Sequence, residues 1–303
     1  MKTIKPNLSV HYMFISVISI ALSNFFAKLS MGSVGIYMTT FQRFFIPFIL
    51  LSIISLIFKR YKQFNFENIK YHLIRSIALT ASQFFLFFSM LGLPMSEATV
   101  LYNTGPIFIV LCSLCLGVKI NLRGLLSLFL GTLGVLLICQ IQNAVINRYV
   151  VFGLLSGFAF CISQMTLQKT SKMEDSLTTM FFLYGLTSIF SFVILLVFYK
   201  SPLYFHSLNI DTYLFLLVLG LSSVSNQFFR GMAYKESVSP EKLAPILYFS
   251  VFISAFLDFV FFHIVPDDEI IFGGSLVLIG SYITVMKREL RFFYFKIIGE
   301  GNV

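Results

Sequence analysis

The sequence carries too little charge to cover the surface of a soluble protein. Only 12% of its 303 residues are charged, and 57% are hydrophobic, whereas soluble domains have about 25% charged residues. The chain also lacks a Gly-rich phosphate loop, a nucleophile elbow and an H-E-x-x-H motif, so no pattern typical of nucleotide hydrolysis or metalloprotease chemistry is present. These absences favour a membrane-embedded protein that is not an enzyme.

Cysteine and histidine are scarce, and their positions do not suggest a metal site. The four cysteines, Cys112, Cys115, Cys139 and Cys161, all lie in apolar runs. Cys112 and Cys115 have C-x-x-C spacing, but no His or charged residue stands beside them, so we interpret all four as small buried apolar residues. The histidines show no metal-ligand spacing, and we expect neither a metal nor a cofactor.

Long apolar runs fill most of the chain. Each has about 20 residues, which is enough for an α-helix to cross roughly 30 Å of hydrocarbon. We therefore predict an all-α integral membrane protein with ten transmembrane helices. The predicted spans lie near Val10–Ser30, Ile36–Phe58, His72–Leu91, Ser96–Leu116, Leu122–Ile141, Val150–Lys169, Leu177–Tyr199, Ile210–Arg230, Pro240–His263 and Ile270–Met286.

The distribution of basic residues predicts how the chain is oriented. With a cytoplasmic N-terminus, 18 of the 22 Lys and Arg residues fall on the cytoplasmic side; Lys28, Arg148 and Lys200 fall outside, and Arg43 lies within the second span. Because cytoplasmic loops hold the excess of basic residues, we expect both termini in the cytoplasm and a location in the inner membrane. The net charge of +9 then reflects contact with anionic lipid head groups rather than with nucleic acid.

The chain also contains an internal repeat. A shift of 144 positions aligns Gln83-Phe84-Phe85 with Gln227-Phe228-Phe229. Each half contains five predicted spans, and because five is odd, the second half enters the membrane in the opposite direction. We predict two inverted five-helix repeats, residues 1–145 and residues 146–303, the second of which includes a cytoplasmic tail. Many secondary transporters use this arrangement.

Motifs of mostly small and apolar residues occur in both halves: Met95–Val100, Gly105–Phe108 and Leu116–Gly117 in the first, and Arg230–Tyr234, Leu243–Tyr248 and Val265–Asp267 in the second. These motifs resemble those of the EamA-type transporters of the drug/metabolite transporter superfamily. The chain departs from the family pattern at Val118, where Glu is usual, and at Asp258, where a small residue is common. The resemblance implies a ten-helix carrier whose substrate cavity lies between the third, fourth, eighth and ninth helices.

Polar side chains inside the predicted spans are the candidates for substrate binding. Such groups are costly in hydrocarbon, so they face either a cavity or a partner helix, and hydrogen bonds that hold the helices together are the alternative interpretation. We expect Arg43, which lies roughly 10 Å inside its span, to be buried as a structural anchor or a gating residue, and Arg75 and Arg230 to reach the cytoplasmic face. The candidate substrate-binding residues are Asn24, Gln83, Tyr102, Asn103, Gln164, Gln227, Tyr248 and Asp258.

Asp258 is the one carboxylate that we place well inside a span, roughly 7 Å from the outer end at His263. Burial destabilises a charged carboxylate unless a cation or hydrogen-bond donors compensate. Three interpretations stay open. Asp258 pairs with a basic residue such as Arg43 as a structural lock, or it faces an outer vestibule that attracts a cationic or zwitterionic solute, or it takes up a proton during transport.

A secondary transporter for a small organic metabolite is the function that we favour. The resemblance suggests S-adenosylmethionine or an amino-acid-like solute as candidate substrates. A non-transporting membrane scaffold and an integral-membrane enzyme are the alternatives, and a polar central cavity would favour the transporter. We expect the solute and the lipid bilayer as partners and no nucleic acid, with a homodimer left open.

Overall fold

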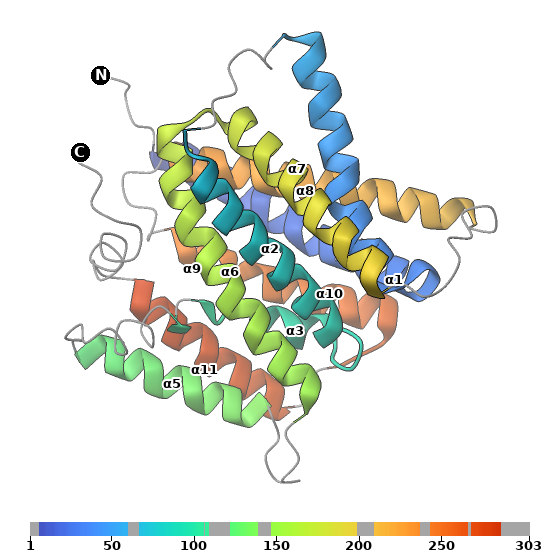
Figure 1. The fold of residues 1–303 in the computed structure, drawn as a ribbon. Coiled ribbons are helices and arrows are strands. Elements are labelled where there is room, and N and C mark those ends of the chain that lie inside the picture. The colour runs from blue at the N-terminus through green and yellow to red at the C-terminus, as the bar shows by residue number, and fades with distance from the viewer. Residues whose placement is uncertain are drawn as a thin grey trace.

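The computed structural model describes residues 6–59, 67–105, 107–108, 122–138, 147–198, 209–236, 243–265 and 268–285. Within these ranges the chain is helical and has no strand, which confirms the all-α prediction. The helices (Figure 1) are α1 (Pro6–Ile57), α2 (Ile69–Ser89), α3 (Met95–Tyr102), α5 (Leu122–Ile138), α6 (Arg148–Met173), α7 (Ser176–Phe198), α8 (Ile210–Glu236), α9 (Ala244–Leu247), α10 (Phe249–Phe262) and α11 (Asp268–Val285). Cys112, Cys115, Cys139, Leu116–Gly117 and Val118 lie outside the described residues.

The first two predicted spans form α1, which breaks at Gly35. This residue has φ 74° and ψ 172°, a backbone conformation that glycine adopts readily because it has no Cβ. Figure 1 shows the two arms of α1 running in different directions from this break. The predicted boundary between the two spans is therefore a real interruption of the helix.

The fourth and ninth predicted spans are each interrupted as well. The helix α3 ends at Tyr102, and a turn at Asn103 and Thr104 precedes further helical residues. In the ninth span, Tyr248 separates α9 from α10. The other predicted spans fall on α2, α5, α6, α7, α8 and α11.

By length and composition, four helices of the described chain could cross a membrane: Leu8–Ile57, Arg148–Met173, Ser176–Phe198 and Ile210–Glu236. The full count of ten crossings stays a prediction.

Helices from the two halves of the chain pack against each other. In each of the three main pairs one helix comes from the first half and one from the second: α1 packs against α8, α2 against α6, and α5 against α11. Polar side chains join α1 to α8 in three pairs that we call the serine seam: Ser16 with Asn226 at 2.9 Å, Ser19 with Ser225 at 2.8 Å and Ser23 with Ser223 at 2.8 Å. Interhelical hydrogen bonds of this kind stabilise helix association in lipid.

Glycine allows α5 and α11 to approach until their backbones are in contact. A Cβ added at Gly134 would lie 2.4 Å from the carbonyl oxygen of Gly273 and 2.8 Å from the backbone nitrogen of Val277. Small residues at such crossings are typical of helix pairs in membranes. The two helices therefore pack through their backbones at this point.

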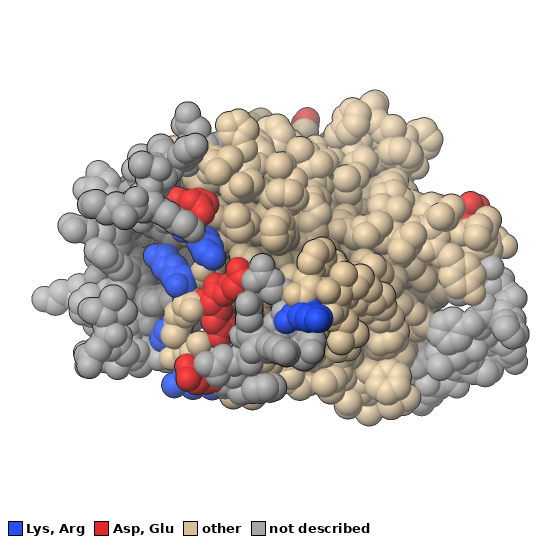
Figure 2. Space-filling model, turned by 90° about the horizontal axis from the view of Figure 1, so that it is seen from above, with Lys and Arg blue, Asp and Glu red and all other residues tan. Residues whose placement is uncertain are grey.

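The surface of the molecule is rich in apolar side chains. Large aliphatic and aromatic residues are exposed on nearly every helix, among them Ile57, Leu122, Leu196 and Phe272. On the face drawn in Figure 2, the coloured charged side chains gather towards one end, and the broad remainder of the described surface has few. An apolar surface of this extent is suited to contact with lipid hydrocarbon.

Candidate functional site

Two small cavities lie side by side within the helix bundle. Ile20 and Tyr102 line both of them, which shows that the cavities adjoin. Each has only about 10 Å³ of free space for a water-sized sphere, which is about what one water molecule needs. We call the two together the central site. The first cavity is also lined by Arg43, Phe44, Leu79, Gln83, Tyr184, Ser223, Asn226 and Gln227, and the second by Asn24, Thr99, Asn103, Phe160, Arg230, Leu247 and Ser250.

Most of the candidate residues meet at this site. Asn24 and Arg43 come from the two arms of α1, Gln83 from α2, Tyr102 and Asn103 from the end of α3, and Gln227 from α8. Gln83 and Gln227 line the same cavity, as their repeat-related positions suggested. The site therefore contains amide, hydroxyl and guanidinium groups from both halves of the chain.

Three of the candidates do not line either cavity. Gln164, on α6, accepts a hydrogen bond of 3.3 Å from the hydroxyl of Tyr234. Tyr248 is buried at the junction of α9 and α10. Asp258 lies near the end of α10, where it forms contacts away from both cavities.

Asp258 forms an ion pair with a basic residue, as one of the three interpretations expected, but the partner is Lys28 and not Arg43. Its Oδ1 lies 3.2 Å from Lys28 Nζ, and its Oδ2 accepts a hydrogen bond of 2.7 Å from the backbone N–H of Ser96. Asp258 is completely buried, whereas the Lys28 side chain is 16% exposed. Lys28 lies on the first arm of α1, beside the end of α10, whereas Arg43 lies on the second arm, at the central site.

Further polar contacts continue from Asp258 along the line where α3 and α10 meet. The hydroxyls of Thr99 and Ser254 are 3.2 Å apart, and Asn103 Nδ2 donates to Ser250 Oγ at 3.1 Å. Residues three or four apart lie on one face of a helix, so a polar stripe of α3 and a polar stripe of α10 face each other. We call these contacts the α3–α10 seam.

The structure corrects the expectation that Arg75 and Arg230 reach the cytoplasmic face, because both side chains are buried with 1% exposure. Their helices are longer than the predicted spans: α2 begins at Ile69 and α8 continues to Glu236. Each arginine is therefore more than one turn away from the end of its helix, among packed neighbours. Arg230 lines the second cavity, and its place on the same face of α8 as Gln227 was the signal that could have identified it.

The three buried arginines are held by neutral groups. Arg43 Nη1 donates to Asn24 Oδ1 at 3.1 Å, Arg75 Nη2 to Gln227 Oε1 at 3.0 Å, and Arg230 Nε to Ser16 Oγ at 3.3 Å. Two of the guanidinium groups also lie over aromatic rings: that of Arg43 is 5.3 Å from the ring centre of Phe87, and that of Arg230 is 5.5 Å from the ring centre of Phe160. Contacts with aromatic faces stabilise a cation but do not neutralise it.

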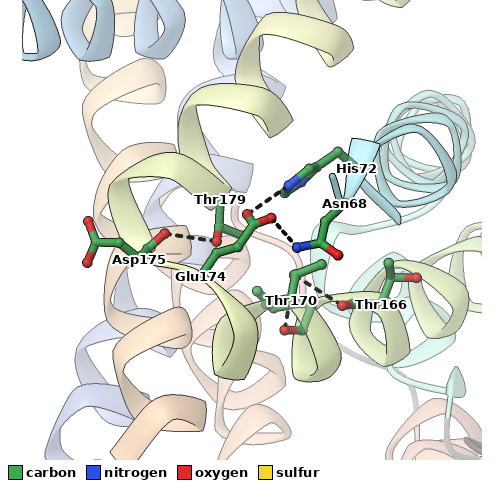
Figure 3. A network of polar contacts seen from close by, with 8 residues as sticks. Asn68, His72, Thr166, Thr170, Glu174, Asp175 and Thr179 are labelled. Carbon is green, nitrogen blue, oxygen red and sulfur yellow. Dashed lines mark hydrogen bonds and ion pairs between the residues drawn. The ribbon is translucent and has the colours of Figure 1, made fainter. Parts of the chain in front are cut away.

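A second polar network ties the connection between α6 and α7 to the start of α2 (Figure 3). Glu174 Oε1 accepts a hydrogen bond of 2.8 Å from Asn68 Nδ2, and Glu174 Oε2 lies 2.9 Å from His72 Nε2. Burial alone would raise the pKa of Glu174, but the hydrogen bonds from His72 and Asn68 outweigh it, so the pKa lies below its usual value. This network fixes the connection without contributing to the two cavities. Among the described residues no three His, Cys, Asp or Glu side chains gather as a metal site would require.

Comparisons with known proteins agree with the resemblance seen in the sequence. Residues 7–140 match the model of the EamA-like transporter family. A solved structure, titled "Crystal structure of protein", is similar with a TM-score of 0.61 and 18% identity over 91% of this chain and 95% of that chain. At this identity the likeness concerns the fold alone. No curated protein matches the chain.

Proposed function

We propose that the protein is a secondary transporter that moves a small organic metabolite across the cytoplasmic membrane by alternating access, because residues 7–140 match the model of the EamA-like transporter family. The observation that carries the proposal is the central site. Polar side chains that would be costly in hydrocarbon converge there from helices of both halves. A membrane scaffold does not require polar side chains to converge at one site.

The positions of the helix interruptions support ten spans in two inverted repeats. The turn at Asn103 and Thr104 and the turn at Tyr248 are 144 to 145 positions apart, which is the register that aligns Gln83 with Gln227. Transporters with inverted repeats often bind their substrate beside helices that are interrupted at corresponding positions. Here both interruptions adjoin residues of the second cavity.

The small volume of the cavities indicates that the central site is closed. A site for a small molecule typically has about 300–1,000 Å³, far more than the space for one water that each cavity offers. At one end of the α3–α10 seam, Asp258 of α10 is bound to Lys28 of α1 and to the backbone N–H of Ser96 of α3. This contact joins the three helices. We assign to this contact the role of a gate that must separate before the site can open on that side.

Gln83 and Gln227 are the residues to which we assign direct contact with the solute. Gln83 Oε1 is buried and has no hydrogen-bond partner among the residues that the structure describes, so it can accept a hydrogen bond from a bound molecule. Gln227 Oε1 accepts from Arg75, which fixes the orientation of that amide. Tyr102, which lines both cavities, is placed to contact the same solute.

Counterflow in proteoliposomes tests the proposal. Vesicles containing the purified chain are loaded with each member of a panel of unlabelled metabolites and then exposed to the labelled form. A transporter accumulates label transiently against its gradient, because exchange through one site couples the two fluxes. Equilibration without such an overshoot would indicate a channel, and absence of flux for every solute would favour the scaffold.

A further inference from the structure

The central site holds positive charge without a matching carboxylate. Arg43 and Arg230 line the central site, and Arg75, which lines neither cavity, donates to Gln227 of the first one. All three arginines are buried, and within the described part of the chain no ion pair joins any of them to an acid. Asp258 is already paired with Lys28. Glu174 is within electrostatic range of Arg75 but is hydrogen-bonded to His72 and Asn68 instead.

The guanidinium groups also retain unused donors. Three of their nitrogen atoms are buried and have no hydrogen-bond partner in the described ranges of the chain: Arg75 Nε, Arg75 Nη1 and Arg230 Nη1. Water could satisfy these N–H groups, but it could not neutralise the charges. Buried charges are normally paired, because removing an ion from water costs several kcal/mol that only a counter-ion and good hydrogen bonds recover.

Arg230 repels both of the other arginines through space. Arg230 is within electrostatic range of both Arg43 and Arg75, so each raises the energy of its neighbour. An anion bound among them would relieve this repulsion and accept the unused donors at the same time. Arginine is suited to this task because its planar group donates two parallel hydrogen bonds to a carboxylate or a phosphate.

We propose that the solute carried through the central site bears an oxyanion, a carboxylate or a phosphate, that is bound by Arg43 and Arg230, which line the site, and by Arg75 beside Gln227. This inference rests on the proposed transport function and adds the charge of the substrate. Gln83 and Tyr102 then contact the rest of the solute. A cationic solute is disfavoured, because it would add to the positive charge already buried.

Thermal unfolding of the purified full-length chain tests for the anion site without requiring transport. Inorganic phosphate and succinate serve as probes, with succinamide as the neutral analogue of succinate and sodium chloride at equal ionic strength as the salt control. We expect phosphate or succinate, or both, to raise the Tm, and succinamide and chloride to have no comparable effect. If neither oxyanion exceeds both controls, the proposal is wrong.

A matched pair of arginine variants locates the effect. Arg75→Gln removes one of the proposed ligands, whereas Arg148→Gln makes the same change at an exposed arginine whose partner is Tyr149. Loss of a charged hydrogen bond should raise the apparent Kd for the stabilising anion about 10- to 100-fold in Arg75→Gln and leave it unchanged in Arg148→Gln. Equal stabilisation of both variants by the anion would overturn the assignment of Arg75 as a ligand. If Arg75→Gln does not fold, the comparison of succinate with succinamide on the wild type is the test of the anion site.

The transport panel separates this inference from the proposed function. Exchange of anionic solutes, with competition by succinate or phosphate, supports both. Exchange of neutral or cationic solutes that neither oxyanion inhibits would refute the anion site and leave the transporter intact. If the oxyanions stabilise the protein but no solute exchanges, the anion site stands and the proposed transport function fails.

Discussion

Replacing either partner of the Asp258–Lys28 pair should destabilise the protein, and by different amounts. Asp258→Asn keeps the size of the side chain but removes its charge, and its amide NH₂ must then face one of the two donors, Lys28 Nζ or the backbone N–H of Ser96. Removing one partner of a buried pair costs about 3–5 kcal/mol. Because Lys28 is partly exposed and can turn its amine towards water, we expect the lower end, about 3 kcal/mol.

Lys28→Met should destabilise the protein more, because it leaves a buried carboxylate without its cation. The carboxylate of Asp258 is completely buried and would keep only the Ser96 N–H as a compensating donor. We expect the upper end of the range, about 5 kcal/mol. The double variant removes both charges, so its loss should be smaller than the sum of the single losses by about 1–3 kcal/mol.

Thermal unfolding of the protein in detergent gives the order of stabilities. The quantity measured is the fraction of protein that remains monodisperse after heating. The expected order is wild type, then Asp258→Asn, then Lys28→Met, with the double variant at or slightly below Lys28→Met but above the level that the sum of the two single losses would give. Asp175→Asn is the matched control, because Asp175 and Lys235 are 4.0 Å apart and both exposed, and such surface pairs contribute about 0–1 kcal/mol. If Lys28→Met unfolds at the wild-type temperature, the ion pair does not stabilise this conformation and cannot be its gate.

Three further changes test other parts of the structure. Gln83→Leu should weaken the affinity for the transported solute about 5- to 150-fold, as expected for 1–3 kcal/mol. Because Gln83 Oε1 has no hydrogen-bond partner among the described residues, the loss of Tm should be limited to that of the side-chain hydrogen bond with Tyr102; unchanged affinity in counterflow would assign this residue to packing. The pKa of Glu174 is lowered in the folded protein, so its contribution to stability is present above the unfolded pKa of about 4.3 and is lost as the pH falls through the folded pKa; between about pH 5 and pH 3 the Tm of the wild type should fall more than that of Glu174→Gln, and parallel profiles would contradict this. Gly134→Ala should lower the Tm because its Cβ would meet backbone atoms of α11, whereas Gly32→Ala, with no atom within 4 Å of the new Cβ, should not; equal Tm values would argue against close packing of α5 on α11.

Hydrophobic length and the internal repeat predict much of the arrangement. Apolar runs indicate where the helices lie, since a segment that crosses hydrocarbon must satisfy its backbone internally. The shift of 144 positions relates Gln83 to Gln227, and both line one cavity. The all-α prediction is confirmed because it depends on local composition, which a sequence contains directly, whereas the inverted repeat stays a prediction.

Side-chain depth and pairing were harder to predict. A hydropathy window tends to end near its first charged residue, so Arg75 and Arg230 appeared to lie near helix ends, although α2 and α8 continue past them. The partner of Asp258 was missed for another reason: Lys28 is 230 positions away in the chain, and only the packing of α10 against α1 brings them together. Contacts of this kind depend on tertiary structure, which no local pattern contains.

The serine seam has a consequence for how the protein is made. Ser16 is separated from its partner Asn226 by 210 positions, and a ribosome that adds about 5–20 residues per second needs roughly 10–40 s to synthesise the intervening chain. During that interval the first arm of α1 is already in the membrane, while the polar groups of its seam have no helix α8 to bond. Until then a serine of the seam can bond within its own helix, as Ser19 Oγ does to the carbonyl oxygen of Ile15 at 2.7 Å, and the packing of α1 on α8 forms only after α8 has been synthesised.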